Sequence, residues 1–221
     1  MVFIVVPAYN EEKNIGRVLR DLFSQGFQNV VVVDDGSSDN TYIEAKKLGV
    51  IVLRHEINRG QGAALQTGNE YVLSQGAEII VHFDADRQFT ASDIGSAIGK
   101  MKKDQVDVIL GSRFLDNRSQ DIPWSKKNVF LPLGRFFQNF FSGIKLTDVH
   151  NGFRLLSRRA AEQITISQSG MAHNSEIVEQ IKRYDLRYME YPVAVTYNEY
   201  GQGVGGGMKI IRDLIIDKFV K

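Results

Sequence analysis

Two aspartates that lie two positions apart, Asp84 and Asp86, follow a short apolar run at 79–83. The run is brief, contains β-branched residues and ends at charge, which is typical of a buried strand. In an extended backbone, side chains two positions apart point to the same side, so the two carboxylates are expected to converge. Carboxylates this close repel each other unless a proton or cation lies between them, and hard oxygen ligands suit Mg²⁺ or Mn²⁺. The alternative is a solvated strand end, because this spacing also occurs by chance.

Two further polar clusters come directly after apolar runs that are expected to be strands. Residues 2–6 are followed by Tyr9, Asn10 and Glu11, and residues 30–33 are followed by Asp34 and Asp35. Ligands of parallel α/β sheets bind beyond the carboxyl ends of the strands. We therefore expect these clusters to share one crevice with the aspartates at 84 and 86, although they lie far apart in the sequence.

Apolar runs of strand type alternate with segments of helical periodicity through the first half of the chain. This alternation predicts an α/β fold with a mostly parallel central sheet and helices on both faces. Asn10 is expected to cap the first helix, with Glu11 and Glu12 at the positive end of the helix dipole. Strands are predicted at 2–6, 30–33, 50–53, 79–83, 106–111, 153–156 and 187–195, and helices at 15–23, 41–48, 63–74, 92–103, 158–164, 175–184 and 208–220.

The composition limits the possible functions. The net charge is +1, so no overall field favours nucleic acid as a partner. The chain of 221 residues has no cysteine, which excludes a disulfide framework, a thiol nucleophile and a zinc–thiolate site. No apolar run approaches the ~20 residues that span a bilayer, and the apolar start lacks a basic leader. Membrane contact is therefore expected to be peripheral or through a partner protein.

The second half of the chain breaks the alternation of strands and helices. A polar loop is expected at 116–122, followed at 124–141 by a segment rich in large apolar and basic residues. That segment suits either a packed core or an interfacial element beneath a lipid headgroup. Residues 200–207 are rich in glycine and suit either a lid or a loose linker. The helix at 208–220 is amphipathic and suits packing on the domain, docking on a membrane or binding to a membrane partner.

Short polar motifs occur in order at 6–12, 33–39, 58–60, 84–88, 111–114 and 148–154. Together they resemble the motifs of the family 2 glycosyltransferases, which have the GT-A fold, over roughly residues 2–197. The branch that looks most similar is that of the polyprenyl-phosphate sugar synthases, which includes dolichol-phosphate mannose synthase. Arg87 stands where that family usually has glycine, and Phe89 and Asn151 also depart from its pattern.

The resemblance implies an inverting enzyme that uses a nucleotide-diphospho-sugar and a divalent metal, Mg²⁺ or Mn²⁺. It implies one domain over 1–221, with a nucleotide-sugar-binding half at 1–113, an acceptor-binding half at 114–200, and the loop and helix at 201–221. It places the enzyme in the cytoplasm, peripheral to the inner face of the cell membrane, where a small membrane protein could be a partner. The implied metal ligands are Asp84, Asp86 and Gln88, and the implied nucleotide-binding residues are Pro7, Ala8, Tyr9, Asn10, Glu11, Asp35, Asn58, Gly60, Asp84 and Ala85.

The resemblance also assigns catalytic roles to Arg113 and Asp148. Arg113 would grip a phosphate of the donor or acceptor, since a planar guanidinium binds two oxygens at once. Asp148 would act as a base or position the sugar. A polyprenyl phosphate acceptor is already ionised and needs little deprotonation, whereas a saccharide hydroxyl needs a general base, for which Asp148 is the first candidate and Glu176 the second.

Simpler interpretations stand beside these roles. Asp34 could merely cap a turn, residues 58–60 could be only a tight turn before a helix, and Arg113 could be a surface residue. His82 is expected to be a packed core histidine rather than a ligand. A non-catalytic module that binds sugar nucleotides is a further alternative. A dinucleotide-dependent oxidoreductase would need Gly-x-Gly-x-x-Gly after the first strand, where this chain has an acidic segment instead.

Overall fold

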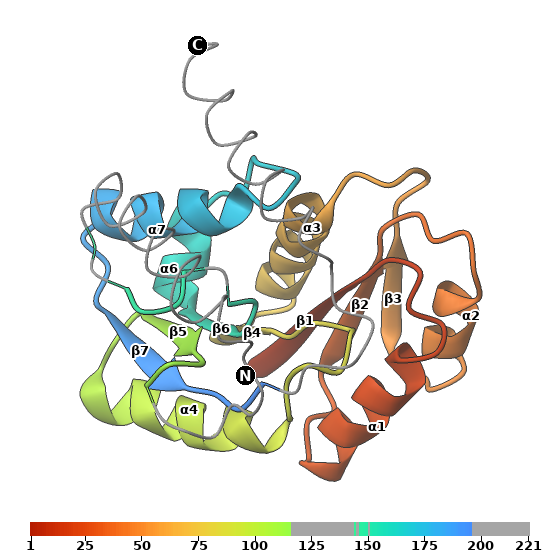
Figure 1. Ribbon diagram of the computed structural model, residues 1–221, viewed down its shortest axis with the longest axis horizontal. Coiled ribbons are helices and arrows are strands. Elements are labelled where there is room, and N and C mark those ends of the chain that lie inside the picture. The colour runs from red at the N-terminus through yellow and green to blue at the C-terminus, as the bar shows by residue number, and fades with distance from the viewer. Residues whose placement is uncertain (116–143, 145, 150, 196–221) are drawn as a thin grey trace, which may run out of the picture.

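The computed structural model describes residues 1–115, 144, 146–149 and 151–195 (Figure 1). These residues form a seven-stranded sheet with the strand order β3-β2-β1-β4-β6-β5-β7. The predicted α/β class with a mostly parallel sheet is confirmed. The strands are β1 (Val2–Ala8), β2 (Val30–Asp34), β3 (Ile51–Arg54), β4 (Ile79–His82), β5 (Val108–Ser112), β6 (Arg154–Ser157) and β7 (Tyr188–Pro192).

One strand interrupts the parallel order. β1 pairs in parallel with β2 and β4, β2 with β3, and β5 with β7. β6 instead lies antiparallel between β4 and β5, with Leu155 opposite Val81 on one side and Ile109 on the other. The amino end of β6 therefore lies at the same edge of the sheet as the carboxyl ends of its neighbours.

Helices cover both faces of the sheet (Figure 1). Alternate residues of β1 enter different cores: Ile4 and Val6 pack in a cluster with residues of α1 and α4, whereas Phe3 and Val5 pack in one with residues of α3 and α7. This alternation is the pattern of a strand buried on both faces. The helices are α1 (Ile15–Ser24), α2 (Thr41–Lys46), α3 (Gln61–Ser74), α4 (Ser92–Asp104), α6 (Arg158–Gln163) and α7 (His173–Arg183).

The sequence placed most elements within a few residues, including the start of α1, but its prediction for the cap of α1 was wrong. Asn10 does not cap this helix, since α1 begins at Ile15 and the preceding residue is Asn14. Asn10 instead has a φ of 56° in the loop before the helix. Glu11 and Glu12 therefore lie before the first turn of α1 rather than within it.

Several predictions concern residues outside the described ranges. These are the loop at 116–122, the aromatic and basic segment at 124–141, the glycine-rich loop at 200–207 and the helix at 208–220. Among the residues that the structure describes, no helix combines the length and the apolar character needed to cross a bilayer.

Candidate active site

Hydrogen bonds join the loops that follow β1 and β2 at the carboxyl edge of the sheet. The amide of Asn10 donates to Ser37 Oγ at 2.9 Å, and the amide of Glu11 donates to Thr41 Oγ1 at 2.7 Å. In the opposite direction, the amide of Ser38 donates to Asn10 Oδ1 at 2.9 Å. Two of the polar clusters that the sequence predicted to meet are therefore in direct contact.

Other predicted nucleotide-binding residues differ in exposure. Pro7 and Ala8 are buried within β1, and Ala85 is also buried. Tyr9 directly follows the strand and is 48% exposed, and Asn58 is exposed in the loop before α3. Of these five residues, only Tyr9 and Asn58 thus offer an accessible side chain to a ligand. The three buried residues can contribute through the shape of the backbone around them.

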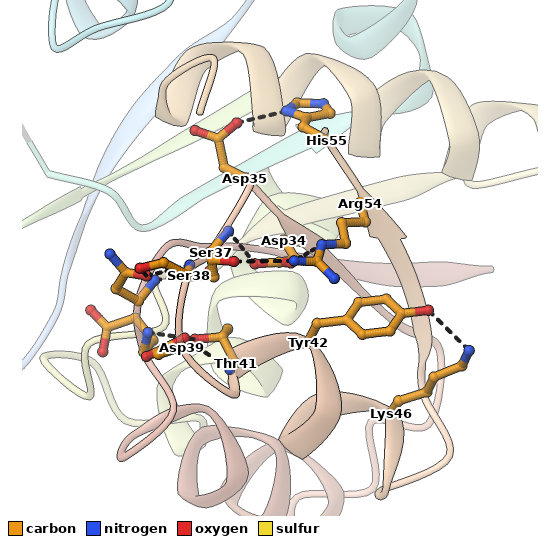
Figure 2. Close-up of polar contacts among 12 residues, drawn as sticks. Asp34, Asp35, Ser37, Ser38, Asp39, Thr41, Tyr42, Lys46, Arg54 and His55 are labelled. Atoms are coloured by element: carbon orange, nitrogen blue, oxygen red, sulfur yellow. Dashed lines mark hydrogen bonds and ion pairs between the residues drawn. The ribbon is translucent and has the colours of Figure 1, made fainter. Parts of the chain in front are cut away.

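Asp34 and Asp35 are both buried but have different partners (Figure 2). Asp34 Oδ1 accepts a hydrogen bond from the amide of Ser37 at 3.2 Å, and its Oδ2 pairs with Nε of Arg54 at 3.0 Å. The interpretation of Asp34 as a residue that caps the turn is therefore confirmed. Asp35 points away from this pair and toward His55 (Figure 2).

Asp35 holds the turn before α3 by its carboxylate. Asp35 Oδ1 accepts from the amide of Arg59 at 2.9 Å, and Oδ2 accepts from the amide of Gly60 at 2.7 Å. Gly60 has a φ of 94°, and a Cβ at this position would lie 2.2 Å from the carbonyl oxygen of Ser169. Glycine is thus needed for both the turn and the close approach.

A residue next to this turn also contacts Asp84, which follows β4. Gln61, the first residue of α3, donates from Nε2 to Asp84 Oδ1 at 2.8 Å. Residues 59–61 therefore connect Asp35 to Asp84 across the edge of the sheet. Sequence reasoning missed Gln61, because a lone glutamine beside a tight turn carries no recognisable signal.

Asp84 and Asp86 lie beyond the end of β4, since that strand stops at His82. The expectation that an extended backbone makes the two carboxylates converge was therefore wrong in its geometry, because the chain turns here and Arg87 has a φ of 65°. The two groups still interact: burial, followed by the charge of Asp86, raises the pKa of Asp84 from 3.8 to about 7, although Arg154 and Gln61 oppose the rise.

The pKa values of Asp86 and Glu11 are also raised. Burial raises the pKa of Asp86, against a hydrogen bond from the amide of Gln88 to its Oδ1 at 3.0 Å. Burial also raises the pKa of Glu11; a hydrogen bond from Asn14 opposes this rise, while the charge of Asp86 adds to it. The edge of the sheet thus concentrates negative charge that its own surroundings do not fully stabilise.

A buried arginine lies beneath this acidic edge. Arg154 is 1% exposed and lies opposite His82 in the pairing of β6 with β4. Its Nη2 donates to Asn174 Oδ1, while its Nη1 has no hydrogen-bond partner among the described residues. Burial lowers the pKa of Arg154 to about 10, against the charges of Asp84 and Asp148. The motif at 148–154 includes Arg154 but predicted no individual role for it.

His82 is a core residue, as predicted. It is buried, and its Nε2 lies 2.8 Å from Asn69 Oδ1. Burial and then the charge of Arg154 lower the pKa of His82 well below its usual range, so the ring is neutral near pH 7.

Arg113 and Asp148 form a bidentate ion pair. Nε of Arg113 donates to Asp148 Oδ2 at 2.6 Å, and Nη2 donates to Oδ1 at 2.7 Å. Asn151 adds a bond from Nδ2 to Asp148 Oδ2 at 3.1 Å. Burial alone would raise the pKa of Asp148, but the hydrogen bonds and charge of Arg113 lower it overall. An aspartate held in this way is a weak base.

The backbone that carries Asp148 is anchored from β7. Glu190 Oε1 accepts from the amide of Thr147 at 2.7 Å and from the amide of Asp148 at 3.2 Å. Glu176, the second candidate for a base, is similarly occupied, since its Oε2 accepts from the amides of Ser167 and Gln168. Both candidate bases thus have structural partners.

A small pocket of about 40 Å³ brings the two halves of the site together. Asp84 and Gln88 come from the loop after β4, Arg113 from the end of β5, and Gly152 from the segment before β6. A carboxylate of the predicted metal site, one of its other predicted ligands and a predicted catalytic residue therefore line one cavity.

The chemistry of these groups fits a divalent cation. Within the described ranges, no group of three or more His, Cys, Asp or Glu side chains is arranged to hold a metal. A site with one or two carboxylates takes its other ligands from water and substrate phosphates, as Mg²⁺ usually does. Burial and the charge of Asp86 oppose the ionisation of Asp84, and a bound cation would stabilise the ionised form of both carboxylates.

We expect Gly152→Ala to reduce activity more than it reduces stability. A Cβ at Gly152 would lie 2.0 Å from Asp84 Oδ2, so the carboxylate must move out of position. Activity should fall at least about tenfold, since catalysis is sensitive to displacements of about 1 Å. Gly99→Ala is the matched control, because a Cβ there meets no atom within 4 Å. Equal activities for these two variants would contradict the placement of Asp84 in the site.

The raised pKa of Asp84 predicts opposite effects of pH on stability and on metal binding. Between pH 3.8 and about 7, the folded chain holds a proton that the unfolded chain has lost. Through this interval the free energy of unfolding of the metal-free chain should therefore fall as pH rises. Metal must displace that proton, so its apparent affinity should fall by about tenfold for each pH unit below 7.

Thermal midpoints with EDTA and with Mn²⁺, measured from pH 5 to 8 on the wild type and on Asp84→Asn, would check both effects. The comparison removes the contribution of other groups, including His82. Parallel pH curves for the two chains would show that Asp84 does not titrate in this interval.

The described sheet, with polar loops gathered at one edge, is the architecture of the GT-A nucleotide-sugar transferases. Residues 3–165 match the family described as Glycosyl transferase family 2. The chain therefore belongs to glycosyl transferase family 2 and is an enzyme of that class, as the sequence motifs predicted.

Individual relatives are similar over nearly the whole chain. An uncharacterized protein of Methanocaldococcus jannaschii, MJ1222, is 39% identical over 98% of this chain and 92% of its own length. The UDP-N-acetylglucosamine–dolichyl-phosphate N-acetylglucosaminyltransferase of Methanococcus voltae is 32% identical over 100% of this chain and 97% of its own length.

A solved structure has the same fold at low sequence identity. Glucosyl-3-phosphoglycerate synthase from Mycobacterium tuberculosis, in complex with Mn²⁺ and UDP-glucose, superimposes with a TM-score of 0.71. It is 16% identical, and the match covers 97% of this chain and 78% of that protein. This likeness shows the fold alone.

Proposed function

We propose that this enzyme is a metal-dependent, inverting hexosyltransferase. It moves a hexose from a UDP- or GDP-sugar to a polyprenyl phosphate carrier. The Methanococcus voltae relative, named for transfer from a UDP-sugar to dolichyl phosphate, supports this donor and acceptor class. The observation that carries the choice of a phosphate acceptor is the bidentate pair between Arg113 and Asp148.

The Arg113–Asp148 pair bears on the choice of acceptor because a sugar hydroxyl and a phosphate differ in whether they need a base. A sugar hydroxyl must lose a proton as it attacks, so its transfer needs a base with an available lone pair. Asp148 gives both of its oxygens to Arg113 and has a lowered pKa. A phosphate attacks in its ionised form and needs no base, which is compatible with an aspartate that only positions an arginine.

The residues divide the work of a single displacement. An oxygen of the acceptor phosphate forms a bond to the anomeric carbon as the bond from that carbon to the nucleoside diphosphate breaks, and no proton is transferred. Asp84, Asp86 and Gln88 would hold the divalent cation, which supplies positive charge to stabilise the departing diphosphate.

Asp35 accepts a hydrogen bond from the nucleobase, with Tyr9, Asn10, Glu11 and Asn58 around it. Arg113 binds phosphate oxygens, and Asp148 keeps its guanidinium oriented.

The acceptor is a lipid, so we place the enzyme at the inner face of the cell membrane as a peripheral protein. The segments that the sequence singled out for membrane contact, 124–141 and 208–220, lie outside the described residues. Vesicle flotation with and without polyprenyl phosphate would check this placement.

The first test is the thermal midpoint of the purified chain with UDP, GDP, CDP and TDP, each with Mn²⁺, Mg²⁺ or EDTA. A ligand that binds only the folded state raises the midpoint by mass action, by an amount that corresponds to about 2.7 kcal/mol at one hundred times its Kd. We expect a metal-dependent rise with UDP or GDP and little with CDP. No rise with any nucleotide would contradict the proposed donor.

The class of acceptor is tested next, with the sugar donor whose nucleotide raised the thermal midpoint. A short polyprenyl phosphate, the matching polyprenol without phosphate, and a saccharide are offered separately, and the product is measured by mass spectrometry. Transfer to the phosphate alone supports the proposal. Transfer to the saccharide alone would show that the enzyme uses a hydroxyl acceptor, and nucleotide binding with neither hydrolysis nor transfer would support a non-catalytic module.

A further inference from the structure

The side chain of His55 links the carboxylate of Asp35 to the hydroxyl of Thr67. His55, the residue after β3, is buried. Its Nδ1 lies 2.6 Å from Asp35 Oδ1 (Figure 2), and its Nε2 lies 2.9 Å from Thr67 Oγ1 on α3. An ionised carboxylate only accepts hydrogen bonds, so Nδ1 is the donor in the first contact. His55 thus ties Asp35 to α3.

These contacts leave the two oxygens of Asp35 unequal. Each carboxylate oxygen accepts about two hydrogen bonds. Oδ1 already accepts from His55 and from the amide of Arg59, whereas Oδ2 accepts from the amide of Gly60 alone among the described residues. The acceptor position that remains for a ligand therefore belongs to Oδ2.

We propose that His55 is a positioning residue that gives the enzyme its preference for nucleobases with an imide N–H. This inference rests on the proposed function, in which Asp35 binds the base. By holding Oδ1, His55 fixes the plane of the carboxylate so that Oδ2 faces the imide N–H of uracil or the N1–H of guanine. Cytosine presents a ring nitrogen without a hydrogen at the same place, which would leave two acceptors facing each other.

Two amide substitutions separate the contacts of His55. The amide nitrogen of asparagine can take the place of Nδ1, so His55→Asn keeps a donor toward Asp35 and loses the contact to Thr67. Glutamine reaches further and can replace Nε2, so His55→Gln keeps the contact to Thr67 and loses the donor. The two variants share polarity and lack of charge, so each serves as the control for the other. Thr67→Val removes the same contact as His55→Asn from the opposite side.

The experiment measures the Kd of UDP, GDP and CDP with Mn²⁺ for each chain, and donor KM and kcat for those that turn over. For His55→Gln we expect the Kd of the preferred nucleotide to rise about tenfold, with little change for CDP. Donor KM should rise with kcat almost unchanged, since uniform binding is lost. His55→Asn and Thr67→Val should keep most of the discrimination.

A purely structural role would lower the folded fraction and weaken every nucleotide equally, so the ratio of Kd values separates the two explanations. An unchanged ratio in His55→Gln, or equal losses in the asparagine and glutamine variants, overturns this inference while the proposed function stands. A wild-type chain that binds none of the nucleotides overturns both. If His55→Gln does not fold, His55→Ala with and without added imidazole replaces it, and recovery of the ratio by imidazole is then the expected result.

Discussion

Asp86→Ala is expected to reduce the rate of sugar transfer by about 10²–10³-fold and to remove the metal-dependent rise in the thermal midpoint. The charge of Asp86 helps to raise the pKa of the Asp84 carboxyl, so the two groups lie close enough to interact. Its removal takes away one of the hard oxygen ligands on which a divalent ion would depend. Steady-state kinetics at saturating donor and thermal midpoints with and without Mn²⁺ measure the two effects.

The metal-free chain gives a second readout for this variant. Without the charge of Asp86, the raised pKa of Asp84 should move back toward its ordinary value, so the metal-free protein should be no less stable than the wild type near pH 8. Asp104→Ala removes an exposed carboxylate that pairs with Lys100 at the end of α4 and serves as the control, with little effect on rate. Full activity in Asp86→Ala would exclude this residue as a metal ligand.

The second large effect is expected from Arg113→Lys and Asp148→Asn, which should each lower the transfer rate by about 10²-fold. A lysine cannot form the two parallel bonds of the guanidinium, and an asparagine leaves Arg113 without its counter-charge. Because the residues act as a unit, the double variant should be no worse than about either single variant. The test is a double-mutant cycle, in which the transfer rates of the wild type, the two single variants and the double variant are measured with a polyprenyl phosphate acceptor.

The alternative predicts a different result for the same four chains. If Asp148 were an independent base, the losses would multiply, and the loss in Asp148→Asn alone would depend strongly on pH. Breaking a buried ion pair costs about 3–5 kcal/mol, so thermal midpoints must accompany the kinetics. Asp148→Glu retains the charge and tests the same pair if the asparagine variant is unstable.

Most strands and their order in the chain were predictable because they are short, apolar and buried, although β3 and β7 are partly exposed. Val30 to Val33 shows this most clearly, since four consecutive valines can only be accommodated where both sides of a strand are covered. The antiparallel direction of β6 was not predictable, since direction depends on where the segment at 113–153 leads the chain. Periodicity contains no information on that path.

The site was predicted less completely than the fold. Carboxylates that follow strands were visible because residue type and position agree, as for Asp35 and Asp84. Gln61, His55 and Arg154 were missed, because each gains its role from partners that lie 20 or more residues away in the sequence. Asn10 was misassigned for a related reason, since its partners Ser37 and Ser38 lie in another loop rather than in the helix that follows.

Arg87 shows how a departure from the family pattern can be accommodated. The position has a φ of 65°, a conformation that glycine adopts without strain and other residues adopt at a cost of roughly 1–2 kcal/mol. The family pattern that the sequence resembles has glycine here, and glycine would adopt this conformation without strain. The turn that carries Asp86 is therefore retained by its surroundings rather than by local preference.

The antiparallel course of β6 has a consequence for how such enzymes diversify. Leu110 near the end of β5 lies opposite Arg154 at the start of β6, and the amide of Gly111 donates to the carbonyl of Phe153 at 2.9 Å. The chain thus leaves the sheet and returns to it at neighbouring points on one edge. Because both junctions lie at one edge, a change of length between them need not alter the pairing of β5 with β6, although Ile144, Leu146 and Val149 pack in the core. If this segment binds the acceptor, as the sequence resemblance implies, the same two junctions are the natural places to graft the corresponding segment of a relative.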